Sequence, residues 1–213
     1  MSPETGWSRE ALAARVAHDI PDGAYVNLGI GMPTAVGNAL PADKEILLHS
    51  ENGILGMGPA PAAEDVDMDL INAGKQPVSL LTGGSYFHHT DSFMIMRGGH
   101  LDVSVLGAFE VAMNGDLANW STGDTSRLPG VGGAMDLAVG AKKVYVVMTH
   151  TDPQGRSKLV TSCQYPLTAM TVVDRVYTEL GVFSVAGDGF TIVELAPGVS
   201  REHVTDVTAA PLH

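Results

Sequence analysis

The sequence predicts an α/β fold: a mostly parallel open sheet with flanking helices and an antiparallel hairpin near the C-terminus. Three observations predict it. Short continuous apolar runs alternate with helical patterns, which is typical of parallel strands buried on both faces. Glycine makes up 25 of 213 residues and gathers in a few loops between these runs. Residues 181–195 alternate in polarity around Gly187-Asp188-Gly189, as an antiparallel hairpin does. Because no repeat or linker interrupts the pattern, we expect residues 1–213 to form one domain.

The N-terminal part predicts helices and strands in alternation. Leu12, Val16 and Ile20 recur at the spacing of an amphipathic helix, with Ser8 as its N-cap. The turn at 21–23 ends this helix. The next expected elements are a buried strand over 24–30, a helix that follows the turn at 29–34 and runs through Leu40, and a short strand over 46–48.

The rest of the chain continues the alternation. Apolar runs predict strands over 78–81, 101–106 and 144–148, and a helix over 134–139 precedes the last of these. After the hairpin at 181–195, a short helix is expected beyond Ser200.

Composition and charge exclude several function classes. The chain carries 12 basic and 24 acidic residues, for a net charge of −12, which opposes binding to nucleic acid or to anionic membranes. No apolar run approaches the ~20 residues of a membrane span, and the first residues lack an export signal. One cysteine, Cys163, cannot form an internal disulfide, which is typical of the cytoplasm; we interpret it as a small packed hydrophobe. An anionic substrate would need a local cationic or amide-lined pocket.

A carboxylate follows the strand over 46–48 directly, in Ser50-Glu51-Asn52-Gly53. Open α/β sheets bind ligands beyond the carboxyl ends of their strands, so Glu51 is a candidate nucleophile or general base. The alternative is a solvated turn that Asn52 and Gly53 only shape.

Two further clusters could bind an anion. Glycines at 130–133 lead into a helix and leave backbone N–H groups free to hold a carboxylate or an oxyanion; the alternative is a tight packing loop. His88, His89 and Arg97 could supply positive charge, although adjacent histidines more often divide between packing and solvent.

Several other sites are set aside. Gly29-Ile30-Gly31 lacks the third glycine of a dinucleotide fingerprint, and no Walker A or G-x-S-x-G sequence is present. Since the sequence also lacks H-E-x-x-H and paired C-x-x-C, we expect neither a metal nor a permanently bound cofactor.

A set of motifs in collinear order covers almost the whole chain and resembles the B (beta) polypeptide of the class I, glutamate-dependent 3-oxoacid CoA-transferases. The motifs are NLGIGMPT (27–34), SENGILGMGP (50–59), DLINAGKQ (69–76), MRGGHLDVSVLGAFEV (96–111), GDLANW (115–120), GGAMDLA (132–138), PLT (166–168) and VELAPGV (193–199).

This resemblance implies that Glu51 attacks an acyl-CoA and becomes a glutamyl-CoA thioester, with coenzyme A as a substrate. It assigns the oxyanion-binding backbone amides to Gly133 and Ala134, and it places Gly107 and Asn52 beside the bound CoA. It also implies an A (alpha) subunit as partner, in an A2B2-type assembly, since the glycine-rich CoA-binding segment of that partner is not found here.

The motif variants GGSYFHHTDSF (83–93), ANWSTG (118–123) and CQYPLT (163–168) look more like those of members that use 3-oxoadipate in the degradation of aromatic compounds. The hypothesis is that His88 or His89, with Arg97, meets the far carboxylate of 3-oxoadipate, which acetoacetate lacks. The alternatives are an acetoacetate-using transferase, an acyl-CoA hydrolase and a non-catalytic module that binds CoA esters.

Overall fold

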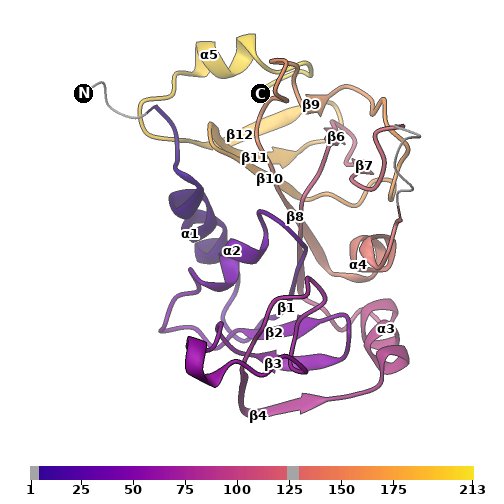
Figure 1. Ribbon diagram of the computed structural model, residues 1–213. Helices are drawn as coiled ribbons and strands as arrows, with labels where there is room; N and C mark the ends of the chain where they lie inside the picture. Colours follow the sequence, from indigo (N-terminus) through magenta and orange to yellow (C-terminus); the bar gives the residue numbers. More distant parts are fainter. Residues whose placement is uncertain (1–4, 124–129) are drawn as a thin grey trace.

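The computed structural model describes residues 5–123 and 130–213. Nine strands of this part of the chain form one mixed sheet, in the order β12-β11-β10-β8-β5-β1-β2-β3-β4 (Figure 1). The five central strands are parallel, whereas both edges are antiparallel. The strands are β1 (Tyr25–Leu28), β2 (Leu47–Ser50), β3 (Ile54–Met57), β4 (Leu80–Tyr86), β5 (Val103–Leu106), β8 (Lys143–Val147), β10 (Arg175–Thr178), β11 (Gly181–Val185) and β12 (Phe190–Leu195).

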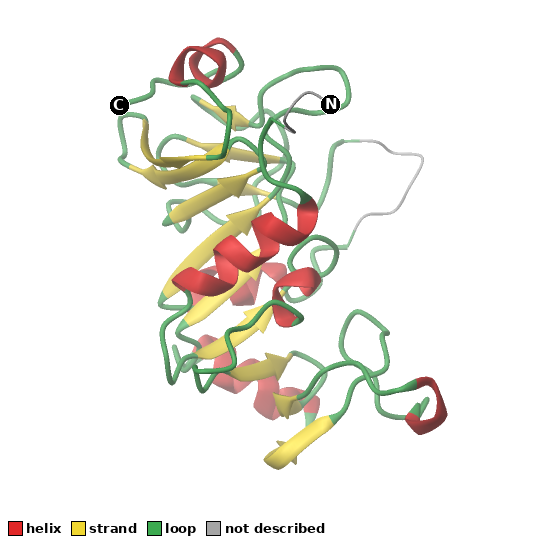
Figure 2. Ribbon diagram, turned by 90° about the vertical axis from the view of Figure 1, so that its left-hand side faces the viewer, coloured by secondary structure: helices red, strands yellow, loops and turns green. Residues whose placement is uncertain are grey.

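Helices cover both faces of the parallel strands, as Figures 1 and 2 show. One face carries α1 (Arg9–Asp19) and α2 (Thr34–Gly37), and the other carries α3 (His89–Arg97) and α4 (Ala134–Gly140). Strand β8 shows why the parallel strands are continuously apolar. Val144 and Val146 pack with α3 and α4, while Tyr145 and Val147 pack with α1, so each of the four positions after the exposed Lys143 faces a core.

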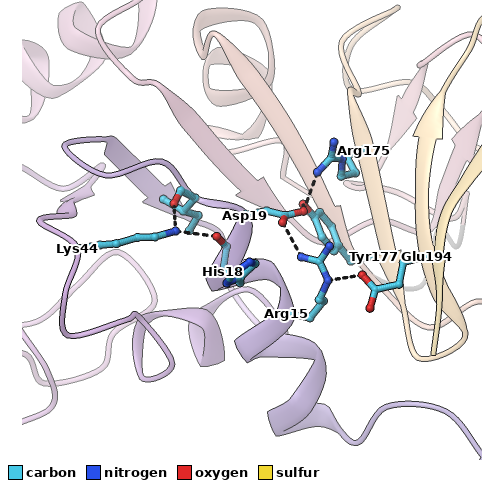
Figure 3. A network of polar contacts seen from close by, with 8 residues as sticks. Arg15, His18, Asp19, Lys44, Arg175, Tyr177 and Glu194 are labelled. Carbon is cyan, nitrogen blue, oxygen red and sulfur yellow. Dashed lines mark hydrogen bonds and ion pairs between the residues drawn. The ribbon is translucent and has the colours of Figure 1, made fainter. Parts of the chain in front are cut away.

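A polar network fixes α1 to the sheet (Figure 3). The carboxylate of Asp19 accepts hydrogen bonds from Arg15 at 2.5 Å, Arg175 at 2.6 Å and Tyr177 at 2.8 Å. Arg15 also pairs with Glu194 on β12 at 2.7 Å. Burial raises the pKa of Asp19, but the hydrogen bonds from Arg15 and Tyr177 outweigh it and hold that pKa below its ordinary value. The network therefore ties three elements that are far apart in the sequence.

A smaller sheet lies beside the C-terminal half of the large one. It consists of β7 (Leu117–Ala118), β6 (Glu110–Ala112) and β9 (Leu159–Val160), in that order. The remaining short elements are a 3₁₀ turn, Ala63–Asp65, and α5 (Arg201–Asp206). Burial raises the pKa of the partly buried Cys163 thiol to about 12, in keeping with a packed residue.

The structure confirms the predicted fold class and most predicted elements. Ser8 caps α1, Ser200 caps α5, and β11 and β12 form the C-terminal hairpin. No helix within the described ranges is both long and apolar enough to cross a bilayer.

Two element predictions were wrong in their bounds, and one strand pairing was missed. The helix expected through Leu40 ends at Gly37, and the strand expected over 78–81 begins at Leu80 and runs to Tyr86. The antiparallel pairing of β3 with its neighbours was not predicted at all. Its physical cause is Gly53, whose φ of +112° reverses the chain directly after Glu51. A Cβ at Gly53 would overlap the carbonyl oxygen of Phe87, so a larger residue would prevent this close approach.

Candidate active site

The candidate site lies where four neighbouring parallel strands end. Strands β8, β5, β1 and β2 run in the same direction, so the loops after them meet at one edge of the sheet. A cavity of about 1100 Å³ opens there. Four of the predicted site residues line it: Glu51, Gly107, Gly133 and Ala134.

Glu51 and Gly133 are brought together from distant parts of the chain. Glu51 follows the last residue of β2, and Gly133 is the N-cap of α4. The Cα of Gly133 packs so closely on Glu51 that a Cβ built there would overlap Oε2 and lie 2.9 Å from Cδ. Gly133 thus leaves space for the carboxylate and places the positive end of a helix beside it.

The surroundings of Glu51 make its carboxylate more basic. The side chain is half-buried, and desolvation raises its pKa above the ordinary value of 4.5. A positive charge on His89 acts in the opposite direction, and the negative charge of Asp136 adds to the rise. Removal from water is therefore the dominant effect, as expected of a nucleophilic carboxylate in a cleft.

Gly107, Ala134 and Asn52 differ in what they offer the cavity. Gly107 follows β5, and its carbonyl oxygen accepts a hydrogen bond from Asn119 Nδ2 at 3.1 Å. Ala134 is the first residue of α4. Asn52 is absent from the cavity wall: its Nδ2 donates to the carbonyl oxygen of Ile71 at 2.7 Å, which holds the segment after the 3₁₀ turn against the end of β2.

The three predicted cationic residues also lie outside the cavity wall. All three belong to α3 or cap it, a helix that the sequence did not reveal. His88 is the N-cap, and its Nδ1 accepts from the backbone N–H of Thr90 at 3.2 Å. His89 is exposed and packs against Phe93, with ring centroids 4.8 Å apart and the two ring planes tilted by 53°. Arg97 pairs with Asp136 at 2.6 Å and is largely exposed.

Sequence reasoning missed a buried polar row that starts in the cavity wall, at Asn27 and His49, and ends at Ser92 on α3. Asn27 Nδ2 donates to the backbone oxygen of His49 at 3.1 Å and lies 3.0 Å from His49 Nδ1. Nε2 of His49 lies 2.9 Å from Ser92 Oγ on α3. Since Asn27 is the donor, His49 Nδ1 accepts and Nε2 carries the proton. Burial lowers the pKa of His49 to about 4, so it is neutral at physiological pH. A polar residue near the end of each of two buried strands was the available signal.

Comparison with known proteins places this arrangement in a family. The family model described as "Coenzyme A transferase" matches residues 9–206. The chain belongs to this family. It is 57% identical to the B subunit of 3-oxoadipate CoA-transferase from Pseudomonas putida, over 96% of each chain. It is 55% identical to the B subunit of the enzyme of the same name from Acinetobacter baylyi, over 96% of this chain and 94% of that one.

A second group of relatives bears a different substrate name. The B subunit of succinyl-CoA:3-ketoacid coenzyme A transferase from Helicobacter pylori is 46% identical, over 95% of this chain and 97% of that one. Each of these three comparisons covers nearly the whole of both chains, so the similarity is not limited to one part of the fold.

Solved structures share the fold at low sequence identity. An acyl-CoA transferase (YdiF) from Escherichia coli O157:H7 superposes with a TM-score of 0.73 and 22% identity, over 97% of this chain. This chain spans only 42% of that larger protein. The decarboxylase AibA/AibB matches with a TM-score of 0.70 and 22% identity, over 96% of this chain and 84% of that one. Since a decarboxylase has the same fold, the fold alone does not determine the reaction.

Proposed function

We propose that this chain is the B subunit of a CoA-transferase that moves CoA from succinyl-CoA to 3-oxoadipate through a thioester on Glu51. One observation carries the chemistry: the half-buried carboxylate of Glu51 stands at the cavity, against the N-terminal end of α4. The substrate rests on similarity, since the relatives named for 3-oxoadipate are 55–57% identical. Succinyl-CoA:3-ketoacid transfer is the second candidate, supported by relatives at 46%.

Glu51 acts as the nucleophile. Its carboxylate oxygen attacks the thioester carbonyl of succinyl-CoA, CoA thiolate leaves, and a mixed succinyl–glutamyl anhydride forms. The thiolate then attacks the glutamyl carbonyl and releases succinate, which leaves a glutamyl-CoA thioester. The carboxylate of the 3-oxo acid runs the same steps in reverse, so the new thioester departs and Glu51 is restored. A carboxylate suits this cycle because its anhydride and thioester exchange with little net free-energy change, whereas serine would form a stable ester.

Two effects supply most of the acceleration in this scheme. Holding the thioester and the carboxylate together contributes roughly 7–11 kcal/mol through proximity. An oxyanion donor contributes about 2.7–4 kcal/mol, and the backbone N–H groups of Gly133 and Ala134 are proposed for that role. Their position at the N-terminal end of α4 supports it.

The site is proposed to be completed by an A subunit, in an A2B2-type assembly. Relatives are named as B subunits, which implies a second, different polypeptide. The chemistry adds a reason, because both the anhydride and the glutamyl thioester hydrolyse if water reaches them. A second polypeptide over the cavity would exclude water and supply a further oxyanion donor. A cytoplasmic location is part of the same proposal and agrees with the single cysteine, Cys163.

A preference for 3-oxoadipate requires residues that bind its far carboxylate. From the sequence, His88 or His89, with Arg97, would bind it. All three residues lie outside the cavity wall, so none of them contacts the cavity in the isolated chain. His88→Ala and His89→Ala variants, measured with 3-oxoadipate and with acetoacetate, test it. A loss confined to 3-oxoadipate supports the assignment, and equal losses on both acceptors would remove it.

The reaction is tested with the chain co-expressed with its A subunit. CoA transfer from succinyl-CoA should proceed to 3-oxoadipate, and Glu51→Gln should abolish it while leaving the complex folded and assembled. Release of free CoA at the same rate without an acceptor would indicate a hydrolase instead. CoA-ester binding without transfer would indicate a non-catalytic module.

A further inference from the structure

Lys158 is an unassigned cation of the cavity wall. Among the described residues that line the cavity, it is the one lysine or arginine. Its backbone N–H donates to the carbonyl of His150 at 3.0 Å, and its carbonyl accepts from the N–H of Val111 at 2.9 Å. Since both backbone groups are satisfied within the protein, what Lys158 offers a ligand is its side chain.

The amine of Lys158 has no ion-pair partner in residues 5–123 and 130–213. The two acids whose charges act on it, Glu179 and Asp152, bond elsewhere. Glu179 accepts the backbone N–H of His150 at 3.0 Å, and Asp152 is paired with Arg156 at 2.6 Å. Burial lowers the pKa of Lys158, while those two carboxylates raise it. A partly buried ammonium group without a counter-ion is costly, and an anionic ligand would relieve that cost.

The position of Lys158 relative to Glu51 defines the ligand that could use it. The backbone of Lys158 is hydrogen-bonded to His150, which lies just beyond the end of β8, and to Val111 on β6. Glu51 follows β2, and β1 and β5 stand between β2 and β8. At about 4.7–4.9 Å per strand, the ends of β2 and β8 are roughly 14 Å apart. A glutamate and a lysine side chain reaching inward would leave between them about the length of a short acyl chain. An acyl group attached at Glu51 could therefore place a second carboxylate at Lys158.

We propose that Lys158, which lines the cavity, and not His88, His89 or Arg97, which lie outside its wall, binds the far carboxylate of dicarboxylic acyl groups and thereby selects them over monocarboxylic ones. This inference rests on the proposed CoA-transferase function, and both of its substrates share the required group. The succinyl group and 3-oxoadipate each carry a second carboxylate, whereas acetoacetate carries none. One lysine would thus serve both halves of the reaction, and it would offset locally the net charge of −12 that repels such anions.

The test uses the complex with its A subunit and follows formation of the glutamyl-CoA adduct in a single turnover, from succinyl-CoA and from acetoacetyl-CoA. Both donors carry the same CoA, so a role in binding CoA affects them equally. Lys158→Met should slow the reaction of succinyl-CoA by about 10- to 100-fold, the effect expected for loss of a charge-assisted hydrogen bond, and that of acetoacetyl-CoA by less than about threefold. Lys158→Arg should restore part of the difference.

Two controls keep the result decisive. Lys142→Met removes one charge from an exposed lysine paired with Asp102, and should leave both donors unaffected. Lys158→Gln is the second neutral variant should Lys158→Met fail to assemble. Equal slowing of both donors, or no slowing of succinyl-CoA, overturns the role of Lys158, as does a selective loss in the His88 or His89 variants alone. Absence of any adduct in the unmodified complex would instead refute the CoA-transferase proposal.

Discussion

Gly133→Ala should slow CoA transfer strongly without unfolding the protein. Gly133 has φ −81° and ψ 0°, a negative-φ conformation that is allowed for alanine. The added methyl group would overlap Oε2 of Glu51 and lie 2.9 Å from Cδ, whereas carbon atoms in contact prefer about 3.5–4.0 Å. Because β2 and α4 anchor the backbone on both sides, the glutamate side chain must yield, and its carboxylate moves by on the order of 1 Å.

The magnitude follows from this displacement. A misplacement of about 1 Å costs a reaction that depends on alignment roughly 100-fold in rate, which is about 2.7 kcal/mol of transition-state free energy. The free energy of unfolding should fall by about 1 kcal/mol or less, the amount by which alanine is a poorer N-cap than glycine.

The assay compares kcat/KM for transfer from succinyl-CoA with the urea midpoint of the same variant. Gly130→Ala is the matched control, because it lies in the same loop and a Cβ there meets nothing within 4 Å. Because it leaves the position of Glu51 unchanged, it should be far more active than Gly133→Ala. A Gly133→Ala variant with transfer within about threefold of the unmodified complex would refute the packing of Gly133 on a catalytic carboxylate.

Three further predictions concern stability, each measured by urea unfolding. Glu51→Gln should stabilise the chain at neutral pH but not below pH 4.5. Burial raises the pKa of Glu51, so its negative charge costs stability only at pH values above the pKa of the unfolded chain. Equal stability of the two proteins at neutral pH would contradict this. Burial lowers the pKa of His150 to about 4, so the free energy of unfolding should fall by on the order of 2–3 kcal/mol between pH 6.5 and pH 4. His150→Asn should reduce this dependence of stability on pH. An unchanged pH dependence in that variant would contradict the reasoning. Asp19→Ala should lower the free energy of unfolding by about 2 kcal/mol, because it leaves three hydrogen-bond donors without their acceptor. Asp102→Ala removes an exposed ion pair with Lys142 and should lower it by less than about 1 kcal/mol. Equal losses would show that the network adds no stability.

Sequence patterns predicted the elements whose signals are local. Strand β8 reads as continuous apolar residues because both of its faces are buried, and α1 shows helical spacing because only one of its faces is. Strand β4 carried little such signal. It is an edge strand with mostly exposed side chains and two glycines, so most of its sequence resembles a loop. The reversal at Gly53 depends on contact with Phe87, which is distant in the sequence.

The residues of the candidate site also separate into those with a local sequence signal and those without one. Glu51 and Gly133 could be predicted because each lies in a motif of its own, at a strand end and at a helix start. Their contact follows only from the fold, which brings the end of β2 against the start of α4. His88, His89 and Arg97 drew attention as nearby charges in the sequence, but α3 holds them outside the cavity wall. Lys158 had no sequence signal because its significance lies in the cavity that the folded chain forms around it.

The most direct measurement is mass spectrometry of the peptide that contains Glu51, taken from the complex after incubation with succinyl-CoA and no acceptor. The account predicts that this peptide carries CoA, that hydroxylamine releases it, and that borohydride reduces the same residue. An unmodified peptide under conditions of rapid turnover, or transfer at full rate by a Glu51→Ala complex, would contradict it.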